Sequence, residues 1–437
     1  MTQLARGIAG HLRQDRVKRF GQQFGWTLSS RVVAALLQMV VLALLARGLE
    51  PAGFAYVSSI NVALLVVVAL NGFGIQRQIS YRRARDPNDE RLPGLFRRRL
   101  RYTYTSAVVW LAATVALALV FDDDRWLAVV PATIWLVAEQ NTQVWNSIAI
   151  ADGKASQMMA SFLFRRVPVV LFLVAALVEG WDIVWSWSVG LALGAVLAYL
   201  FQYRFQEPWA RVLVPRRDRE KVGLDLGYWW SQVGEQMRDL DVPLLTAFVD
   251  PVVAGIYALP ARFVRPMNMI TIATGSVAFP RLSRRKTVWR TELLAGVAVG
   301  AAPTVLIAAL LFLAAPALPL IAGDAYAGSV TTMQIVCVAT ALWGPCSLMV
   351  VFMQSRSDQA TRAAGATVMT YNCLQLGGVV LGGILGGAPG AALAYVVGQA
   401  LTLVTLTVLA VRYAAPGRPE KVAASFATTA TAPEQAN

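Results

Sequence analysis

The chain has 437 residues, of which 57% are hydrophobic and 15% are charged. A soluble domain has about 25% charged residues, so this composition excludes an ordinary globular domain. Long apolar stretches, such as residues 108–120 and 304–315, are typical of helices that cross a lipid bilayer. The formal net charge is +14. Basic loops that orient membrane helices explain this charge better than nucleic-acid binding does, so no nucleic-acid partner is expected.

The hydropathy pattern predicts an all-α polytopic membrane protein with about 12 transmembrane helices. Each apolar stretch is close to the ~20 residues that cross a ~30 Å hydrocarbon core. In chain order, the expected spans are residues 24–46, 53–74, 102–120, 126–149, 157–178, 184–203, 223–248, 253–277, 291–315, 329–353, 364–386 and 389–412. The span over 223–248 is the least hydrophobic of them.

The spans divide into two sets of six, and this division predicts the domain organisation. In chain order we expect a cytoplasmic basic segment (1–23), an N-terminal six-helix bundle (24–203), a cytoplasmic basic linker (204–222), a C-terminal six-helix bundle (223–413) and a disordered cytoplasmic tail (414–437). The tail is rich in alanine, threonine and proline and carries no apolar pattern.

The gaps between spans alternate in charge. Gaps such as 75–101, 204–222 and 278–290 are rich in arginine and lysine, whereas gaps such as 121–125 and 249–252 are neutral or acidic. Because basic loops stay on the cytoplasmic side of a membrane, this alternation predicts that both termini are cytoplasmic.

Residue types that commonly carry catalysis are scarce. His11 is the only histidine, and the cysteines Cys337, Cys346 and Cys373 all fall within apolar stretches. We find no nucleophile–base constellation, metal-ligand spacing or phosphate-binding loop. The sequence therefore favours a protein that is not an enzyme and has no metal site.

A short motif occurs twice, 200 residues apart. Glu50-Pro51 follows the first span, and Asp250-Pro251 follows the seventh. Proline suits the first turn of a helix, because the backbone N–H that it lacks has no partner there. With six spans in each half, the repeat suggests two bundles related by a pseudo-two-fold axis along the membrane normal.

Several motifs resemble those of the polysaccharide-export flippases, the O-antigen-type translocases. Residues 47–54 (Arg-Gly-Leu-Glu-Pro-Ala-Gly-Phe) are similar to the family's Arg-x-Leu-Gly-Pro-x-x-Phe-Gly turn, although Glu50 and Ala55 stand where glycines are typical. Three further segments are similar to family motifs of the second half, namely residues 241–245 (Asp-Val-Pro-Leu-Leu), 255–257 (Gly-Ile-Tyr) and 279–283 (Phe-Pro-Arg-Leu-Ser). These flippases belong to the multidrug/oligosaccharidyl-lipid/polysaccharide exporter superfamily.

The resemblance implies a V-shaped pair of six-helix bundles around a cavity that opens alternately to each side of the bacterial cytoplasmic (inner) membrane. The resemblance also implies that the substrate is an undecaprenyl-diphosphate-linked oligosaccharide, which is used to build O-antigen, capsule or exopolysaccharide. A polysaccharide polymerase and other assembly proteins are candidate partners beside the lipid bilayer. No cofactor is implied, and coupling to protons or sodium ions is left open. Two alternatives remain at this stage: a multidrug exporter of the same superfamily, and a non-transporting scaffold of a glycan assembly complex.

Charged residues inside the spans indicate where such a substrate would bind. A charge at the bilayer centre costs about 2.5–3.5 kcal/mol on insertion scales, so it normally faces a cavity or a partner. Guanidinium groups bind phosphate oxygens bidentately, which suits a diphosphate. The candidates for a cationic substrate-binding cavity are Arg262, Arg265, Arg165, Arg166, Arg238 and Arg31.

Each of these arginines has a structural alternative. Arg262 and Arg265 share one helix face, and they either line the cavity or form structural ion pairs. Arg165 and Arg166 point about 100° apart, so we expect one to line the cavity and the other to pair or to extend to the surface. Arg31 lies seven residues into the first span, about 10 Å deep, and it either lines the cavity or extends back to the cytoplasmic surface.

The acidic residues within the spans are candidates for coupling or ion pairing. They are Glu235, Asp239, Asp241 and Glu139. Glu235 and Asp239 lie one helical turn apart, which fits either an internal ion-pair cluster or a protonatable switch.

Glu139 begins a polar stretch that extends to Asn146. This stretch either lines the cavity or satisfies neighbouring helices. Trp145, Trp229 and Trp230 either stack on sugar rings or pack within the protein.

Overall fold

The computed structural model describes residues 32–122, 124–152, 156–211, 236–268 and 290–414, with a few isolated residues between these ranges. The described residues are almost entirely helical and include no strand.

Two groups of helices follow one another along the chain. The N-terminal group consists of a helix over Val32–Gly48, α2 (Pro51–Leu70), α3 (Ile75–Arg85), α4 (Arg91–Phe121), α5 (Ala132–Ala151), α6 (Ser156–Glu179), α7 (Ile183–Tyr203) and the short η2 (Pro208–Ala210). The C-terminal group consists of η3 (Arg238–Leu240), α9 (Asp241–Phe248), α10 (Pro251–Val264), η4 (Arg265–Met267), α12 (Arg290–Ala314), α13 (Leu318–Ala322), α14 (Ser329–Gln354) and α15 (Asp358–Ala414). The short η1 (Asp124–Val129), η5 (Ala315–Ala317) and η6 (Asp324–Tyr326) lie in the connections.

The long α15 consists of two membrane spans joined by a kink. The backbone leaves the helical conformation at Gly386 and Gly387, and Gly387 has a φ of 60°, which favours glycine. A Cβ atom at Gly382 or Gly390 would collide with the backbone of the other, so glycine permits the close packing of the two arms. With this division, each predicted span overlaps a described helix, although parts of the spans 24–46, 223–248 and 253–277 lie outside the described residues. The all-α fold with about 12 spans is confirmed.

Seven helices of the described part are long and apolar enough to cross a membrane. Large apolar side chains such as Leu119, Val178, Leu313 and Leu385 are exposed on them. An exposed apolar surface of this extent suits contact with lipid, so the protein is a multi-pass membrane protein.

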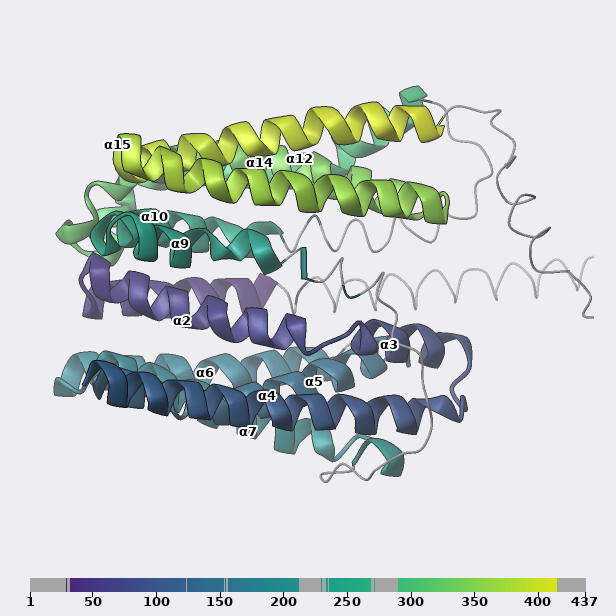
Figure 1. Ribbon diagram of the computed structural model, residues 1–437, viewed down its shortest axis with the longest axis horizontal. Coiled ribbons are helices and arrows are strands. Elements are labelled where there is room, and N and C mark those ends of the chain that lie inside the picture. Colours follow the sequence, from purple (N-terminus) through teal and green to yellow (C-terminus); the bar gives the residue numbers. More distant parts are fainter. Residues whose placement is uncertain are drawn as a thin grey trace, which may run out of the picture.

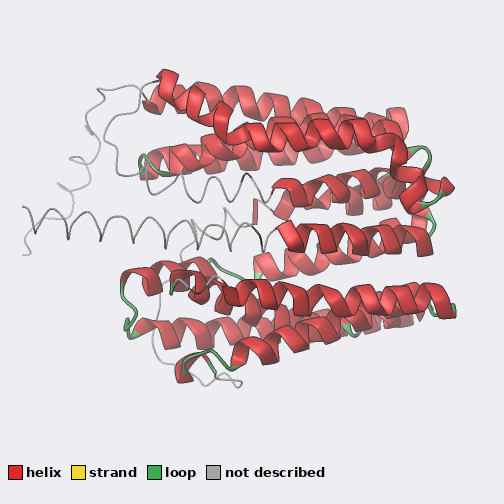
Figure 2. Cartoon of the chain, turned by 180° about the vertical axis from the view of Figure 1, so that it is seen from behind, coloured by secondary structure: helices red, strands yellow, loops and turns green. Residues whose placement is uncertain are grey.

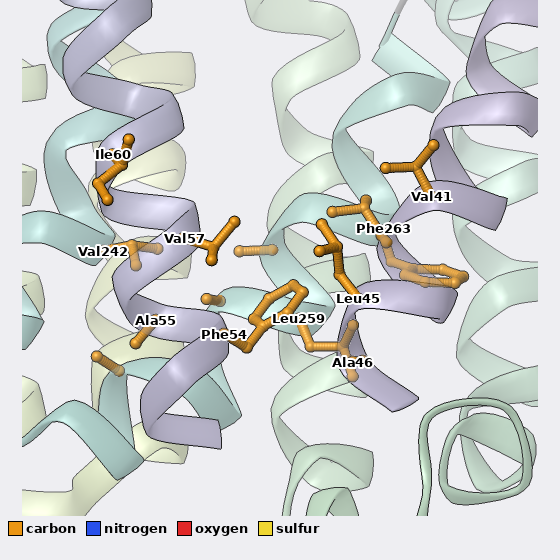
Figure 3. Close-up of a cluster of buried hydrophobic side chains, with 14 of the residues drawn as sticks. Val41, Leu45, Ala46, Phe54, Ala55, Val57, Ile60, Val242, Leu259 and Phe263 are labelled. Atoms are coloured by element: carbon orange, nitrogen blue, oxygen red, sulfur yellow. The ribbon is translucent and has the colours of Figure 1, made fainter. Parts of the chain in front are cut away.

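The two groups lie side by side, with their helices approximately along one direction (Figures 1 and 2). Helices α2, α9 and α10 lie where the groups meet (Figure 1). Buried side chains of these helices and of Val32–Gly48 form one continuous apolar layer, which includes Phe54, Val242 and Leu259 (Figure 3). The core therefore joins both halves of the chain.

At one end of the molecule, which we call the neutral end, the short connections 49–50, 180–182, 249–250 and 315–328 lie together. There the two halves are hydrogen-bonded to each other. The Arg47 guanidinium donates to the carbonyl oxygens of Leu320 (3.0 Å) and Ile321 (2.9 Å), and the Tyr326 hydroxyl donates to the carbonyl oxygen of Leu49 at 3.0 Å. The structure is therefore closed at this end.

The repeated Pro turns lie within this closed end. Both α2 and α10 begin at the prolines of the repeat, Pro51 and Pro251. Asp250 caps α10 by accepting hydrogen bonds from two backbone N–H groups, whereas the side chain of Glu50 forms no such cap. Gly255 of α10 lies directly against the backbone of Pro51, where any Cβ atom would collide. The sequence repeat thus corresponds to a direct contact between the halves.

At the opposite end, which we call the basic end, residues 75–101 form α3 and the first turns of α4. We expected a basic connecting segment there, and helix α4 begins eleven residues before the predicted span. Arg83 of α3 donates to both carboxylate oxygens of Asp152 (2.8 and 3.0 Å) and to Glu207 (2.5 and 3.3 Å). This pairing lowers the pKa of Glu207 and raises the pKa of Arg83, so α3 is held to the ends of α5 and α7.

Candidate functional site

The C-terminal half holds a cluster of charged side chains around Asp241, at the start of α9. Asp241 lies nine residues from the turn at Asp250, which is about 13 Å along a helix. Arg262 of α10 and Arg265 of η4 lie on the adjacent helix, and the side chain of Asp241 is 1% exposed. These charges therefore lie within the thickness of a bilayer core.

Arg265 joins the two carboxylates of this cluster. Its Nη1 lies 2.5 Å from Asp239 Oδ1, and its Nη2 donates to Asp241 Oδ2 at 2.6 Å. Arg262 lies beside it, with Nη2 3.1 Å from the Asp239 carbonyl oxygen and 3.4 Å from Asp241 Oδ1. Asp241 also accepts hydrogen bonds from the Tyr257 hydroxyl (2.9 Å) and from the Val242 backbone N–H (2.8 Å).

All of these contacts hold η3, α9 and α10 to one another. Both oxygens of Asp241 have charged and neutral partners, so the cluster satisfies its buried carboxylate. The structure therefore brings Arg262, Arg265, Asp239 and Asp241 together as ion pairs. Whether they also line a substrate cavity stays a prediction.

Arg238 precedes this cluster on η3 and faces α14. Its guanidinium carbon lies 5.3 Å from the centre of the Trp343 ring, a cation–π distance. Within the described residues, the carboxylate oxygen that lies closest to it is Asp239 Oδ1 at 3.9 Å, which makes only a weak ion pair. Arg238 thus adds positive charge to the cluster without a close counter-ion among the described residues.

The N-terminal half holds a second, smaller charged site between α5 and α6. Arg165 Nη1 donates to Glu139 Oε1 at 2.5 Å, and Gln143 Nε2 donates to the same oxygen at 3.0 Å. Glu139 Oε2 is buried and has no hydrogen-bond partner. This carboxylate, unlike Asp241, therefore keeps one unused oxygen.

The adjacent Arg166 has no hydrogen bond or ion pair within the described part of the chain, and its side chain is half-buried. It lies ten residues after Ser156, where α6 begins, which is about 15 Å along the helix. The structure thus separates the two neighbouring arginines: Arg165 is the buried ion-pair partner of Glu139, and Arg166 is the guanidinium available to another group.

The polar stretch after Glu139 mostly satisfies neighbouring helices. Gln140 accepts a hydrogen bond from Thr103 of α4 at 2.9 Å, and Asn146 accepts one from Gln202 of α7 at 2.6 Å. Trp145 is 1% exposed and packs against aromatic side chains of α4 and α7, so it is a packing residue.

Some predicted site residues receive no structural test. Arg31, Glu235 and Trp230 lie outside the described residues. Sequence reasoning missed Tyr257 as a partner of Asp241, although it lies in the quoted Gly-Ile-Tyr motif and one turn before Ala261 and Arg262 on α10.

A family model described as polysaccharide biosynthesis protein matches residues 20–286. The match covers more than half of the chain. The protein belongs to this polysaccharide biosynthesis family. It is accordingly a member of the multidrug/oligosaccharidyl-lipid/polysaccharide exporter superfamily, as the sequence motifs predicted. No curated protein sequence matches the chain.

Solved structures of exporters share the fold of this polysaccharide biosynthesis family member. An inward-facing multidrug resistance MATE transporter of the same superfamily has a TM-score of 0.68 at 14% identity, with 89% of this chain and 98% of that chain covered. The lipid II flippase MurJ, in an inward closed conformation, has a TM-score of 0.69 at 10% identity, with 89% of each chain covered. The MATE multidrug transporter DinF-BH in complex with R6G has a TM-score of 0.67 at 17% identity, with 90% and 95% covered. At these identities the likeness shows the fold, which is that of a transporter.

Proposed function

We propose that the protein is a flippase that moves an undecaprenyl-diphosphate-linked oligosaccharide across the cytoplasmic membrane by alternating access, for surface polysaccharide synthesis. Membership of the polysaccharide biosynthesis family and the likeness of the fold to a lipid II flippase support this proposal. In this proposal both termini are cytoplasmic, and the basic end faces the cytoplasm.

The observation that carries the proposal is an excess of positive charge in the membrane interior. Within the described residues, five guanidinium groups (Arg165, Arg166, Arg238, Arg262 and Arg265) stand beside three carboxylates (Glu139, Asp239 and Asp241), which leaves two positive charges in excess. Uncompensated charge is costly inside a bilayer. A diphosphate supplies two phosphoryl groups that such guanidiniums bind.

In this account Arg166 is the residue that contacts the diphosphate most directly. It is half-buried, lies in the membrane interior and has no competing carboxylate at ion-pair distance within the described helices. Arg238, with its weak ion pair, is the second such residue. Arg265, which is paired at 2.5 and 2.6 Å, and Arg262, whose carboxylate contacts are 3.4 and 3.8 Å, contribute charge to the layer while they hold α9 against α10.

Closure of the neutral end supports alternating access. Contacts between the halves, such as Arg47 with Leu320 and Tyr326 with Leu49, must break before cargo can leave at this end. Only interactions that differ between the two states shift their populations. Binding of the diphosphate therefore has to favour the state in which these contacts are absent.

For coupling, we propose Glu139 as the carboxylate that takes up a proton. Its Oε2 atom is buried without a partner, so protonation there breaks no existing hydrogen bond. The alternative switch at Glu235 and Asp239 stays a prediction, since Asp239 is paired with Arg265 and Glu235 is outside the described residues. Replacement of Glu139 by Gln should remove any dependence of transport on a proton gradient.

The proposal is tested by lipid extraction from a strain that lacks this chain. We expect undecaprenyl-diphosphate-linked oligosaccharide to accumulate while surface polysaccharide is lost, and we expect the wild-type chain to restore both. Unchanged levels of both lipid and polymer, together with increased sensitivity to cationic drugs, would instead support a multidrug exporter. The excess positive charge argues against that alternative, because it repels cationic drugs.

A further inference from the structure

The most unusual charged residue outside the proposed substrate site is Arg99 of α4. Its side chain is completely buried, and none of its three guanidinium nitrogens has a hydrogen-bond partner among the described residues. A buried polar group without a partner is rare and destabilising, and a buried unpaired charge is more so. Arg99 is therefore poised to bind a group that the described residues do not supply.

A second unused donor lies on the facing helix. Thr103, one turn after Arg99 on α4, donates to Gln140 Oε1 on α5 at 2.9 Å. The Gln140 side chain is 0% exposed, and its Nε2 has no partner. Because residues four apart lie on the same helix face, Arg99 and Gln140 approach the same α4–α5 contact. Together they present four unused nitrogen donors.

No carboxylate of the basic end within the described residues pairs with Arg99. Asp152 and Glu207 are both bound by Arg83, and Asp89 is bound by Arg82 at 3.0 Å. Arg99 therefore contrasts with Arg165 and Arg265, whose charges are compensated by acids. Four donor nitrogens and an uncompensated positive charge suit an anion that offers several acceptor oxygens.

The level of Arg99 in the membrane identifies the source of that anion. Arg99 lies 22 residues before Phe121, the last residue of α4 at the neutral end, which is about 33 Å along the helix. The hydrocarbon core is about 30 Å thick, so Arg99 lies at the level of the headgroup phosphates of the leaflet at the basic end. Arg97 and Arg98 precede it directly on the same helix and attract anionic headgroups to this place.

We propose that Arg99, with Gln140, is a binding site for the phosphate of a membrane lipid headgroup, separate from the charged layer of the membrane interior. The phosphate reaches the guanidinium when the apolar cluster around Phe96, Leu100 and Trp145 loosens, and its binding compensates the buried charge. Phosphate lipids are thereby ligands that stabilise the N-terminal half. Binding at Arg99 does not depend on the identity of the cargo, because any phosphate-bearing lipid of this leaflet can supply the phosphate.

The test uses the purified full chain in detergent and measures the unfolding temperature. Three probes are titrated: phosphatidylglycerol, galactosyl diacylglycerol (which has no phosphate) and inorganic phosphate. We expect phosphatidylglycerol to raise the unfolding temperature of the wild type and galactosyl diacylglycerol to leave it unchanged. We expect Arg99→Met to weaken the phosphatidylglycerol effect by roughly tenfold or more in half-saturating concentration.

Arg101→Met is the matched control, because Arg101 is exposed two residues further along the same helix. It should keep the response to phosphatidylglycerol. If inorganic phosphate acts with the same dependence on Arg99, the site is confirmed and its natural ligand is free phosphate. Equal phosphatidylglycerol responses of Arg99→Met and wild type, or no response of the wild type to either phosphate probe, would overturn the proposal.

Without any probe, Arg99→Met should be at least as stable as the wild type, because it removes a buried charge that has no partner. Should this variant fail to fold, Arg99→Lys takes its place. The lysine retains the charge but has no planar fork, so it should bind phosphatidylglycerol more weakly than arginine does. A wild-type response in Arg99→Lys would then contradict the role of the guanidinium.

Discussion

The charged sites of the two halves both combine arginines with a buried carboxylate, but the two carboxylates differ in how many of their oxygens have hydrogen-bond partners. In the C-terminal half, Asp241 accepts hydrogen bonds from Arg265, Arg262, Tyr257 and a backbone N–H. In the N-terminal half, one oxygen of Glu139 has no hydrogen-bond partner, and Arg166 forms no hydrogen bond or close ion pair within the described residues. In the cluster around Asp241 this carboxylate is fully used, although Asp239 Oδ1 and Arg265 Nη1 form an ion pair without a hydrogen bond and Arg262 Nε forms none. The site around Glu139 leaves a carboxylate oxygen for a proton and the Arg166 guanidinium for a ligand. We infer that the first holds helices together and the second changes partners during transport.

The largest expected effect comes from breaking the cluster around Asp241. Asp241→Asn leaves Arg262 and Arg265 with one fewer carboxylate in a buried site, and removal of one partner from a buried pair costs about 3–5 kcal/mol. We expect a marked fall of the unfolding temperature in detergent and a lower amount of protein in the membrane. Asp324→Asn, at an exposed position of the neutral end, should match the wild type. A wild-type unfolding temperature for Asp241→Asn would show that the cluster has no structural role.

A smaller effect is expected where the two halves touch at the neutral end. A Cβ atom at Gly255 would collide with the backbone of Pro51, whereas one at Gly53, at the pseudo-equivalent turn, would only touch Leu49 at 3.4 Å. Forcing extra atoms into a packed contact costs about 1–3 kcal/mol. Gly255→Ala should therefore loosen the closed end, and Gly53→Ala should leave it intact.

This difference can be measured by labelling with a membrane-impermeant maleimide. The reporter is a cysteine in place of Ser59, whose hydroxyl lies 3.3 Å from that of Thr246 across the two halves. Gly255→Ala should raise its labelling rate, and Gly53→Ala should not. Equal rates in the two variants would show that the Gly255 contact does not keep the end closed.

The smallest effect concerns the basic end and depends on pH. The hydrogen bond from Arg83 lowers the pKa of Glu207 below its usual 4.5. A carboxylate with a lowered pKa in the folded state stabilises the fold above about pH 4.5, and this contribution is lost as the pH falls further. Glu207→Gln should reduce stability slightly at neutral pH and should lose less on acidification than the wild type does.

Glu207 is half-exposed, so solvent screening keeps this contribution small. The control is Glu90→Gln, at an exposed acid near the same end. Its unfolding temperature should follow the wild-type pH profile. If Glu207→Gln also follows that profile, the ion pair of Arg83 with Glu207 does not stabilise the fold.

Much of the fold could be predicted from the sequence, because a membrane span is a property of about 20 consecutive residues. The turns at Pro51 and Pro251 could also be predicted, because the repeated motif indicated that they are equivalent positions in the two halves. Helix α3 was missed because its residues are strongly polar, and its stability depends on the pairing of Arg83 with residues 69 and 124 positions away. Partners so distant in the chain cannot be predicted from the local amino-acid composition.

The charged residues of the candidate site could be selected from the sequence, but their roles could not. Adjacent arginines at 165 and 166 are indistinguishable by hydropathy, and only the packing of α5 against α6 gives one of them Glu139 as its partner. Likewise, Arg99 resembled one more residue of a basic loop, whereas in the structure it is among the largest fully buried side chains. Partner choice depends on tertiary contacts between helices, which a single sequence does not show.

The central claim is that the unpaired Arg166 contacts the cargo while its neighbour Arg165 holds the fold. The most direct test compares Arg166→Gln with Arg165→Gln in a strain that lacks the chain, with surface polysaccharide, accumulated lipid-linked oligosaccharide and unfolding temperature measured for each. We expect Arg166→Gln to keep the wild-type unfolding temperature and to lose export by roughly tenfold or more, as suits the loss of a charge-assisted hydrogen bond to phosphate. Arg165→Gln should lower the unfolding temperature. Wild-type export by Arg166→Gln, in a protein present at normal amounts, would contradict the account.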